Sequence, residues 1–121
     1  YERIGSAVQE LDGNFRIGNY DAVLEQCQTI AAQEINPKLR SVAYTYAGVI
    51  LGDNPETDEL YLRLAIKEDP ENIEAHRALG ELYHDLKKET KADYHFSRIQ
   101  EIRAKRANTP GRLESKLSSD N

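Results

Sequence analysis

Three histidines and one cysteine are the side chains of this 121-residue chain best suited to catalysis or metal binding. His76 and His84 lie eight residues apart on one expected helix, so their side chains point about 80° apart and do not form an i, i+4 metal pair. His95 belongs to the next expected helix, and the sequence has no His-Glu-x-x-His motif or cysteine pair. Cys27 has no basic neighbour that would activate its thiol. We therefore expect these side chains to pack or to remain partly exposed, with no metal and no cofactor.

An acidic stretch, GDNPETDEL at residues 52–60, raises the alternative of a calcium site. Calcium loops place their carboxylates at alternating positions and end on a glutamate, and this stretch lacks that order. Its carboxylates instead suit the first turn of a helix, where the helix dipole favours negative charge. The sequence also has no glycine-rich phosphate loop and no Ser/His/Asp order. We therefore predict a protein that is not an enzyme.

Asparagine or aspartate directly before proline marks three expected helix starts, at Asn36-Pro37, Asn54-Pro55 and Asp69-Pro70. The first residue of each pair can cap a helix with its side chain, and proline fits the first helical position because it has no N–H group. Between the breaks, apolar residues recur at helical spacing, and no stretch alternates long enough for a strand. The sequence predicts six helices, near residues 3–17, 20–34, 38–51, 56–67, 71–86 and 90–106.

The expected connections between these helices are short, about 2 to 5 residues. Short connections place consecutive helices antiparallel and side by side. We therefore predict one all-α domain that covers residues 1–107. Residues 108–121 are small, polar and rich in turn formers, which predicts a disordered tail or a short appended helix.

A specific pattern lies in the last two expected helices. It has the form L-G-x-x-Y followed by A-x-x-x-F, and its residues are Leu79, Gly80, Tyr83, Ala92 and Phe96. This pattern resembles the tetratricopeptide repeat, a helix pair of about 34 residues. In that family the glycine lets the first helix approach the second closely, opposite a small residue that corresponds to Ala92. Such packing would offset the cost of roughly 1 kcal/mol that glycine has relative to alanine inside a helix.

Two earlier segments resemble the same repeat. Gly48 lies 32 residues before Gly80, in the middle of a second repeat. The segment FRIGNYDAVLEQC, residues 15–27, resembles the turn and second helix of a first repeat, in which Leu11 stands where glycine is usual. The resemblance covers residues 4–106. It implies three antiparallel helix pairs, stacked as a short right-handed superhelix.

Proteins of this family bind other proteins, and the first helices of the pairs line a concave groove that receives a peptide or an amphipathic helix. The resemblance therefore implies a protein-binding module or adaptor. The family's frame predicts a groove with an apolar middle and ends of mixed charge, lined by Val8, Gln9, Asp12, Phe15, Arg16, Val42, Thr45, Tyr46, Val49, Arg77, Glu81 and His84. Phe15 and Tyr46 are either anchors for the partner or part of the core, and Arg77 is the expected polar contact.

Two alternatives concern the mode of binding. One subclass of the family binds a C-terminal carboxylate and carries Gly-Asn four residues before the phenylalanine. Here Gly13-Asn14 directly precedes Phe15, and Asp12 at the aligned position would repel a carboxylate, so we do not expect this mode. The other alternative is a structural scaffold, which assembles through self-association of stacked repeats or within a larger complex.

Charge is distributed unevenly along the chain, which has a net charge of -5. Residues 1–86 hold 7 basic and 16 acidic side chains, whereas residues 87–112 hold 8 basic and 3 acidic ones. The acidic body argues against nucleic acid as a partner, RNA included, because phosphate contacts require a basic surface. The basic end either forms a solvated face of the last helix or docks on an acidic surface of a partner, a membrane or a second copy.

The sequence also predicts where the protein resides. No apolar run reaches the ~20 residues that a helix needs to cross a bilayer, and the single cysteine, Cys27, has no internal partner for a disulfide. These features predict a soluble, cytoplasmic protein. The chain begins at Tyr1 and contains no methionine, so we also expect a shortened or processed product whose targeting signal, if there was one, has been removed.

Overall fold

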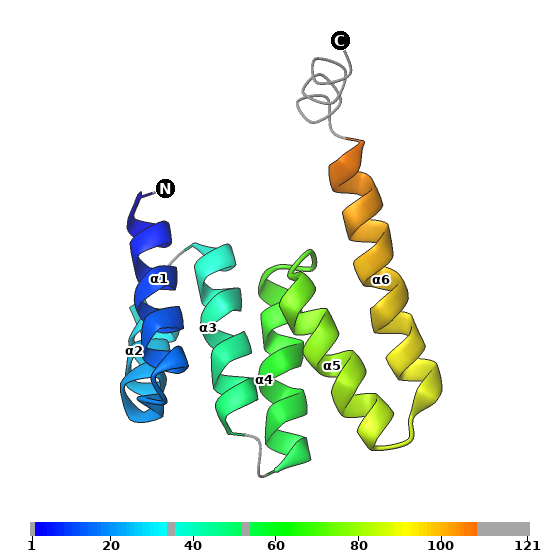
Figure 1. The fold of residues 1–121 in the computed structure, drawn as a ribbon, viewed down its shortest axis with the longest axis horizontal. Coiled ribbons are helices and arrows are strands. Elements are labelled where there is room, and N and C mark those ends of the chain that lie inside the picture. Colours follow the sequence, from blue (N-terminus) through cyan, green and yellow to red (C-terminus); the bar gives the residue numbers. More distant parts are fainter. Residues whose placement is uncertain (1, 34–35, 52–53, 109–121) are drawn as a thin grey trace.

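The computed structural model describes residues 2–33, 36–51 and 54–108, and all regular structure within these ranges is helical (Figure 1). The prediction of an all-α chain is therefore confirmed for the described residues. Each helix begins and ends within two residues of its expected bounds. The predicted tail lies outside the described residues from position 109 onward. The six helices are α1 (Glu2–Arg16), α2 (Tyr20–Gln33), α3 (Pro37–Ile50), α4 (Pro55–Glu68), α5 (Ile73–Asp85) and α6 (Glu89–Ala107).

Helices α3 and α4 begin at the predicted Asn-Pro pairs. The Asn36 side chain accepts hydrogen bonds from the N–H groups of Lys38 and Leu39, at 2.9 and 3.4 Å. The Asn54 side chain accepts one from the N–H group of Glu56, at 3.0 Å. These N–H groups lie in the first helical turn, where no backbone carbonyl is available to them. Capping by asparagine therefore explains why both helices begin where they do.

The start of α5 differs from the sequence prediction. The pair Asp69-Pro70 does not begin the helix, because the Asp69 side chain accepts a hydrogen bond from the N–H group of Glu71 and forms a turn. The helix begins at Ile73, and Asn72 is its N-cap. The expected start was wrong because the sequence offers two capping residues in this turn, and the second is the one that caps.

Asn72 also joins α5 to the two preceding helices. Its Nδ2 atom donates to the hydroxyl of Ser41 at 2.8 Å and to that of Thr45 at 3.0 Å, both on α3. Ser41 is fully buried and donates to the carbonyl of Ala65 near the end of α4, at 2.6 Å. A buried polar group is costly unless it is hydrogen-bonded, so these four residues fix the junction of α3, α4 and α5.

Each helix packs against the next one along the chain, and the odd-numbered helices also contact one another, α1 with α3 and α3 with α5. Within the described part of the chain, the even-numbered helices do not contact one another. Figure 1 shows the result, a row of neighbouring helices that runs from α1 to α6. This arrangement is compatible with a helical repeat.

The apolar core has two parts. One lies between α1, α2 and α3 and consists of the buried residues Leu11, Val23, Cys27, Ile30, Leu39 and Ala43. The other joins α4, α5 and α6 and consists of the buried residues Leu62, Leu79, Tyr83 and Ala92. Burial of apolar area stabilises the fold by about 25 cal/mol per Å². The first cluster therefore holds α1, α2 and α3 together, and the second holds α4, α5 and α6 together.

Two glycines mark the closest approach of paired helices. A Cβ atom at Gly48 on α3 would lie 2.9 Å from Cγ of Leu62 on α4. A Cβ atom at Gly80 on α5 would lie 2.6 Å from the ring of Phe96 on α6. The family's pattern implied Ala92 opposite Gly80, but the atoms nearest to that glycine all belong to Phe96. A side chain at Gly48 would displace buried Leu62, whereas one at Gly80 would meet the end of the Phe96 side chain and require that ring to move.

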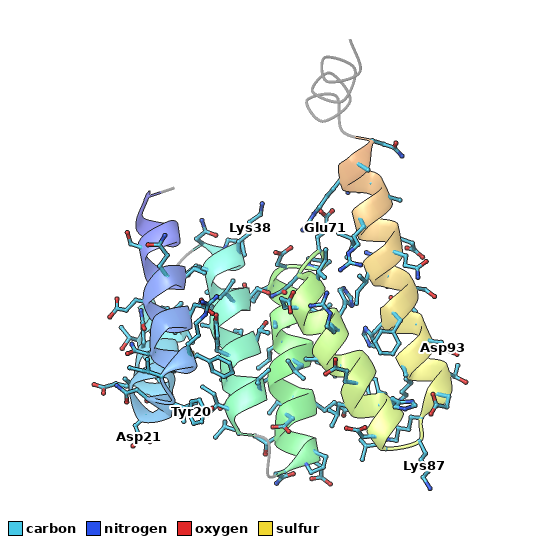
Figure 2. All side chains as sticks on the ribbon, viewed as in Figure 1. Tyr20, Asp21, Lys38, Glu71, Lys87 and Asp93 are labelled. Carbon is cyan, nitrogen blue, oxygen red and sulfur yellow. The ribbon has the colours of Figure 1, made fainter. Side chains whose placement is uncertain are left out.

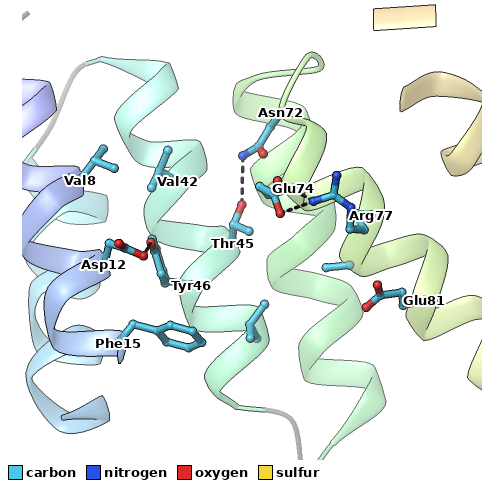
Figure 3. Close-up of a pocket in the computed structure, with 12 residues that line it drawn as sticks. Val8, Asp12, Phe15, Val42, Thr45, Tyr46, Asn72, Glu74, Arg77 and Glu81 are labelled. Atoms are coloured by element: carbon cyan, nitrogen blue, oxygen red, sulfur yellow. Dashed lines mark hydrogen bonds and ion pairs between the residues drawn. The ribbon is translucent and has the colours of Figure 1, made fainter. Parts of the chain in front are cut away.

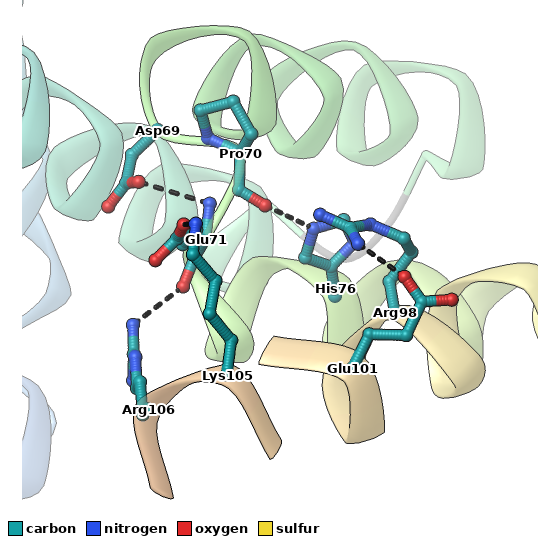
Figure 4. Close-up of polar contacts among 8 residues, drawn as sticks. All are labelled: Asp69, Pro70, Glu71, His76, Arg98, Glu101, Lys105 and Arg106. Carbon is teal, nitrogen blue, oxygen red and sulfur yellow. Dashed lines mark hydrogen bonds and ion pairs between the residues drawn. The ribbon is translucent and has the colours of Figure 1, made fainter. Parts of the chain in front are cut away.

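Polar contacts connect the end of α6 to the turn before α5. Lys87, in the turn before α6, points away from the other helices instead (Figure 2). Lys105 donates to the carboxylate of Glu71 at 2.7 Å, and Arg106 donates to the Glu71 carbonyl at 2.9 Å (Figure 4). The Lys105 ammonium lowers the pKa of the Glu71 carboxyl. Part of the basic end therefore binds the acidic body of the same chain.

Candidate binding groove

A groove of about 510 Å³ lies between α1, α3 and α5 (Figure 3). It forms on these helices because α3 contacts both α1 and α5. The lining contains apolar side chains and polar groups, and most of these polar groups are bonded to one another. Its lining consists of Val8, Asp12, Phe15, Val42, Thr45, Tyr46, Val49, Asn72, Glu74, Arg77, Ala78 and Glu81.

The lining includes nine residues from the set expected from the sequence, and three of that set do not line it: Gln9, Arg16 and His84. Arg16 forms an ion pair with Asp12 at 2.9 Å. His84 lies further along α5 and pairs with Glu89 at the start of α6, at 3.1 Å. Both side chains therefore bind neighbours within the fold.

Three lining residues were not expected: Asn72, Glu74 and Ala78. Glu74 and Ala78 follow a signal that the sequence does contain, because positions 74, 77, 78 and 81 have the spacing i, i+3, i+4, i+7 of one helix face. Asn72 precedes α5 and has no such signal. Its place in the groove follows from its bonds to α3.

The α1 side of the groove is fixed by an aromatic and acidic cluster. The Tyr46 hydroxyl donates to the Asp12 carboxylate at 3.2 Å, and the Tyr46 ring meets the Phe15 ring edge to face at a centroid distance of 5.4 Å. Burial raises the pKa of Tyr46 to about 12, and the Asp12 carboxylate acts in the same direction. Phe15 and Tyr46 therefore hold α1 against α3, and their remaining exposed surface faces the groove (Figure 3).

The α5 side of the groove carries the other charges. Arg77 donates to both carboxylate oxygens of Glu74, each at 2.6 Å, so these two charges balance each other. Glu81 follows Arg77 by one helical turn and is exposed. Within the part of the chain that the structure describes, the Glu81 carboxylate forms no ion pair or hydrogen bond. Its carboxylate is therefore available to a bound molecule.

The floor between the two sides is apolar. Val8 and Val42 are half-buried, and Ala78 is half-buried on α5. Val49 is 47% exposed, which is high for a valine on a helix that packs against four others. An apolar floor in a concave surface favours binding of apolar side chains, since their transfer from water is favourable.

Among the described residues, His76 and His95 face each other, whereas Cys27 lies in the core between α1, α2 and α3. His76 is buried and its Nε2 atom donates to the Pro70 carbonyl at 2.8 Å (Figure 4), while its Nδ1 atom faces Nδ1 of His95 at 3.0 Å. Burial lowers the pKa of both rings, that of His95 to about 4, where the charge of His76 acts in the same direction. Burial also raises the pKa of Cys27 to about 11, so the thiolate is disfavoured.

No group of three or more metal-ligating side chains lies together in the part of the chain that the structure describes. Among the described helices, none is both long enough and apolar enough to span a bilayer. Comparison of the chain with protein-family models, curated proteins and solved structures found no match. The resemblance to the tetratricopeptide repeat therefore rests on the residue pattern and on the packing of neighbouring helices.

Proposed function

We propose that the chain is a non-enzymatic module of the tetratricopeptide type, which binds a segment of a partner protein in the groove between α1, α3 and α5. The observation that carries this proposal is the open apolar floor of the groove. Its polar surroundings are bonded among themselves, as in the Asp12–Tyr46 and Glu74–Arg77 pairs, whereas Val49 remains exposed. A concave apolar surface of this kind is the common feature of sites that bind peptides or helices.

The two glycines support the repeat part of the proposal. Gly48 and Gly80 are 32 residues apart, and each lies on an odd-numbered helix where the next helix comes closest. The period is close to the 34 residues of the tetratricopeptide repeat. In that frame the odd-numbered helices are the first helices of their pairs, which are the helices expected to line the groove.

A matched pair of exposed apolar residues tests the groove as the binding site. Val49→Gln places a neutral polar group on the groove floor, whereas Leu60→Gln makes the same kind of change on α4, outside the groove. Both residues are exposed, at 47% and 58%, so we expect either change to alter the unfolding free energy by less than about 0.5 kcal/mol. We expect Val49→Gln to reduce the amount of partner recovered from a native extract, and Leu60→Gln to leave it unchanged.

The measurement is quantitative mass spectrometry of the proteins retained by the wild type and by each variant, with thermal unfolding as the control. If the wild type and Val49→Gln recover equal amounts of the partner, the groove is not the binding site. Light scattering over a range of concentrations addresses the scaffold alternative. The scaffold alternative predicts oligomers that grow with concentration. If Leu60→Gln disrupts these oligomers and Val49→Gln does not, the functional contact lies on the outer surface of α4 instead of in the groove.

A further inference from the structure

The charges of the groove are unequal in number and in availability. Three carboxylates line it, those of Asp12, Glu74 and Glu81, against one guanidinium, that of Arg77. Arg77 is bonded to Glu74, and the nearby Arg16 is bonded to Asp12. Each arginine is therefore engaged by a carboxylate, and the excess charge of the lining is negative.

Of the three carboxylates, the one of Glu81 accounts for the unbalanced negative charge of the lining. Asp12 already accepts bonds from Arg16 and Tyr46, and Glu74 accepts two from Arg77. For Glu81, the described residues provide no such partner. The Arg77 side chain is directed to Glu74 and away from Glu81 (Figure 3). A cation brought by a bound segment would find its counter-charge at this point.

From this charge distribution we infer that the occupant of the groove is a basic and apolar segment of another protein. Its apolar side chains lie on the floor beside Val42 and Val49, and a lysine or arginine of the segment pairs with Glu81. Complementary charge steers such segments to the groove, and like charge excludes acidic ones. The inference rests on the proposed function, to which it adds the chemistry of the partner.

Selection from a library of random peptides displayed on phage tests this inference without knowledge of the natural partner. The full chain is immobilised, and the enriched peptides are compared with the unselected library. We expect the enriched peptides to contain several large apolar residues and an excess of lysine and arginine over aspartate and glutamate. We also expect Val49→Gln to bind the most enriched peptide, made synthetically, at least about threefold more weakly than the wild type.

Charge variants then assign the basic residue to its site. We expect Glu81→Gln to weaken binding of the synthetic peptide roughly threefold, and Glu81→Lys to weaken it roughly tenfold, with both losses reduced at high salt. Glu10→Lys is the matched control, because Glu10 is exposed on α1, does not line the groove, and gives the same change in net charge. Binding by Glu10→Lys should stay within about twofold of the wild type.

The possible outcomes separate this inference from the proposed function. Peptides that need Val49 but show no basic excess, or that bind Glu81→Lys as well as wild type, overturn the inference and leave the groove as a binding site. Equal losses for Glu81→Lys and Glu10→Lys overturn it too, because the effect would then be one of net charge. Failure to enrich any peptide whose binding depends on Val49 overturns both the inference and the proposed function.

Discussion

Asn72 both caps α5 and hydrogen-bonds to α3, and the variant Asn72→Asp distinguishes these two roles by its effect on the unfolding free energy. The Oδ1 atom of Asn72 caps α5 through the N–H group of Ala75 at 3.0 Å, and its Nδ2 atom donates to Ser41 and Thr45. Asn72→Ala removes all three bonds. Loss of a cap costs about 1 kcal/mol, and each of the other bonds contributes about 1 kcal/mol. We therefore expect the unfolding free energy to fall by about 3 kcal/mol.

Asn72→Asp keeps the cap but replaces the amide donor with a carboxylate oxygen. The hydroxyl protons of Ser41 and Thr45 are already donated, to the carbonyls of Ala65 and Ser41 respectively. The new oxygen would therefore face two oxygen lone pairs at the positions of the present bonds. We expect Asn72→Asp to lower the unfolding free energy by about 2 kcal/mol, although aspartate is as good a cap as asparagine.

Urea denaturation followed by circular dichroism measures both variants, and its pH dependence gives a second readout. A protonated carboxyl group can donate to Ser41, so the fold should raise the pKa of the introduced group above its unfolded value of about 3.9. The deficit of Asn72→Asp relative to wild type should therefore shrink as pH falls toward that range. A neutral effect of Asn72→Asp at pH 7 would show that Asn72 acts as a cap alone and would refute its role in joining α5 to α3.

Two further predictions concern the helix pairs. Gly48→Ala should lower the unfolding free energy by about 1 kcal/mol, because the new methyl group meets buried Leu62. Gly80→Ala should lower it less, because Phe96 is 37% exposed and its ring can turn away. Equal losses of unfolding free energy in urea denaturation would contradict this difference. The fold lowers the pKa of His95 to about 4 and also lowers that of His76, so the unfolded chain binds more protons and stability should fall as pH drops from about 6.5 to about 4. His95→Gln should flatten this part of the pH profile, and an unchanged profile would show that the ring is not responsible.

The helices were predictable from sequence because local features determine most of their bounds. Asn36 and Asn54, each followed by proline, mark the starts of α3 and α4, and the structure shows both side chains as caps. The start of α5 was not predictable, since Asp69 and Asn72 are both good caps in one turn. The choice between them depends on Ser41 and Thr45, which lie about 30 residues earlier in the chain. Contacts at such a distance leave no local signal.

The groove shows the same division between local and distant causes. Val42 and Val49 were expected in the groove because the resemblance to the repeat family implies that the first helix of each pair lines it, and both valines do line it. The family resemblance does not tell which charged residues of the groove pair with each other. The sequence does contain a signal for the pair of Glu74 and Arg77, because their i, i+3 spacing places them side by side on a helix. The position of Phe96 against Gly80 required the side-chain conformation itself, which the sequence does not provide.

These pairings bear on how selective the proposed module would be. The bonds of Asp12 with Tyr46, of Glu74 with Arg77 and of Asn72 with Thr45 shape the groove before any partner arrives, so little ordering of the groove has to accompany binding. They also use most of its polar groups, which leaves an apolar floor and the carboxylate of Glu81 for recognition. Apolar contacts discriminate weakly among large aliphatic and aromatic side chains. Under the proposed function, the groove would therefore select a class of basic, apolar segments rather than one sequence.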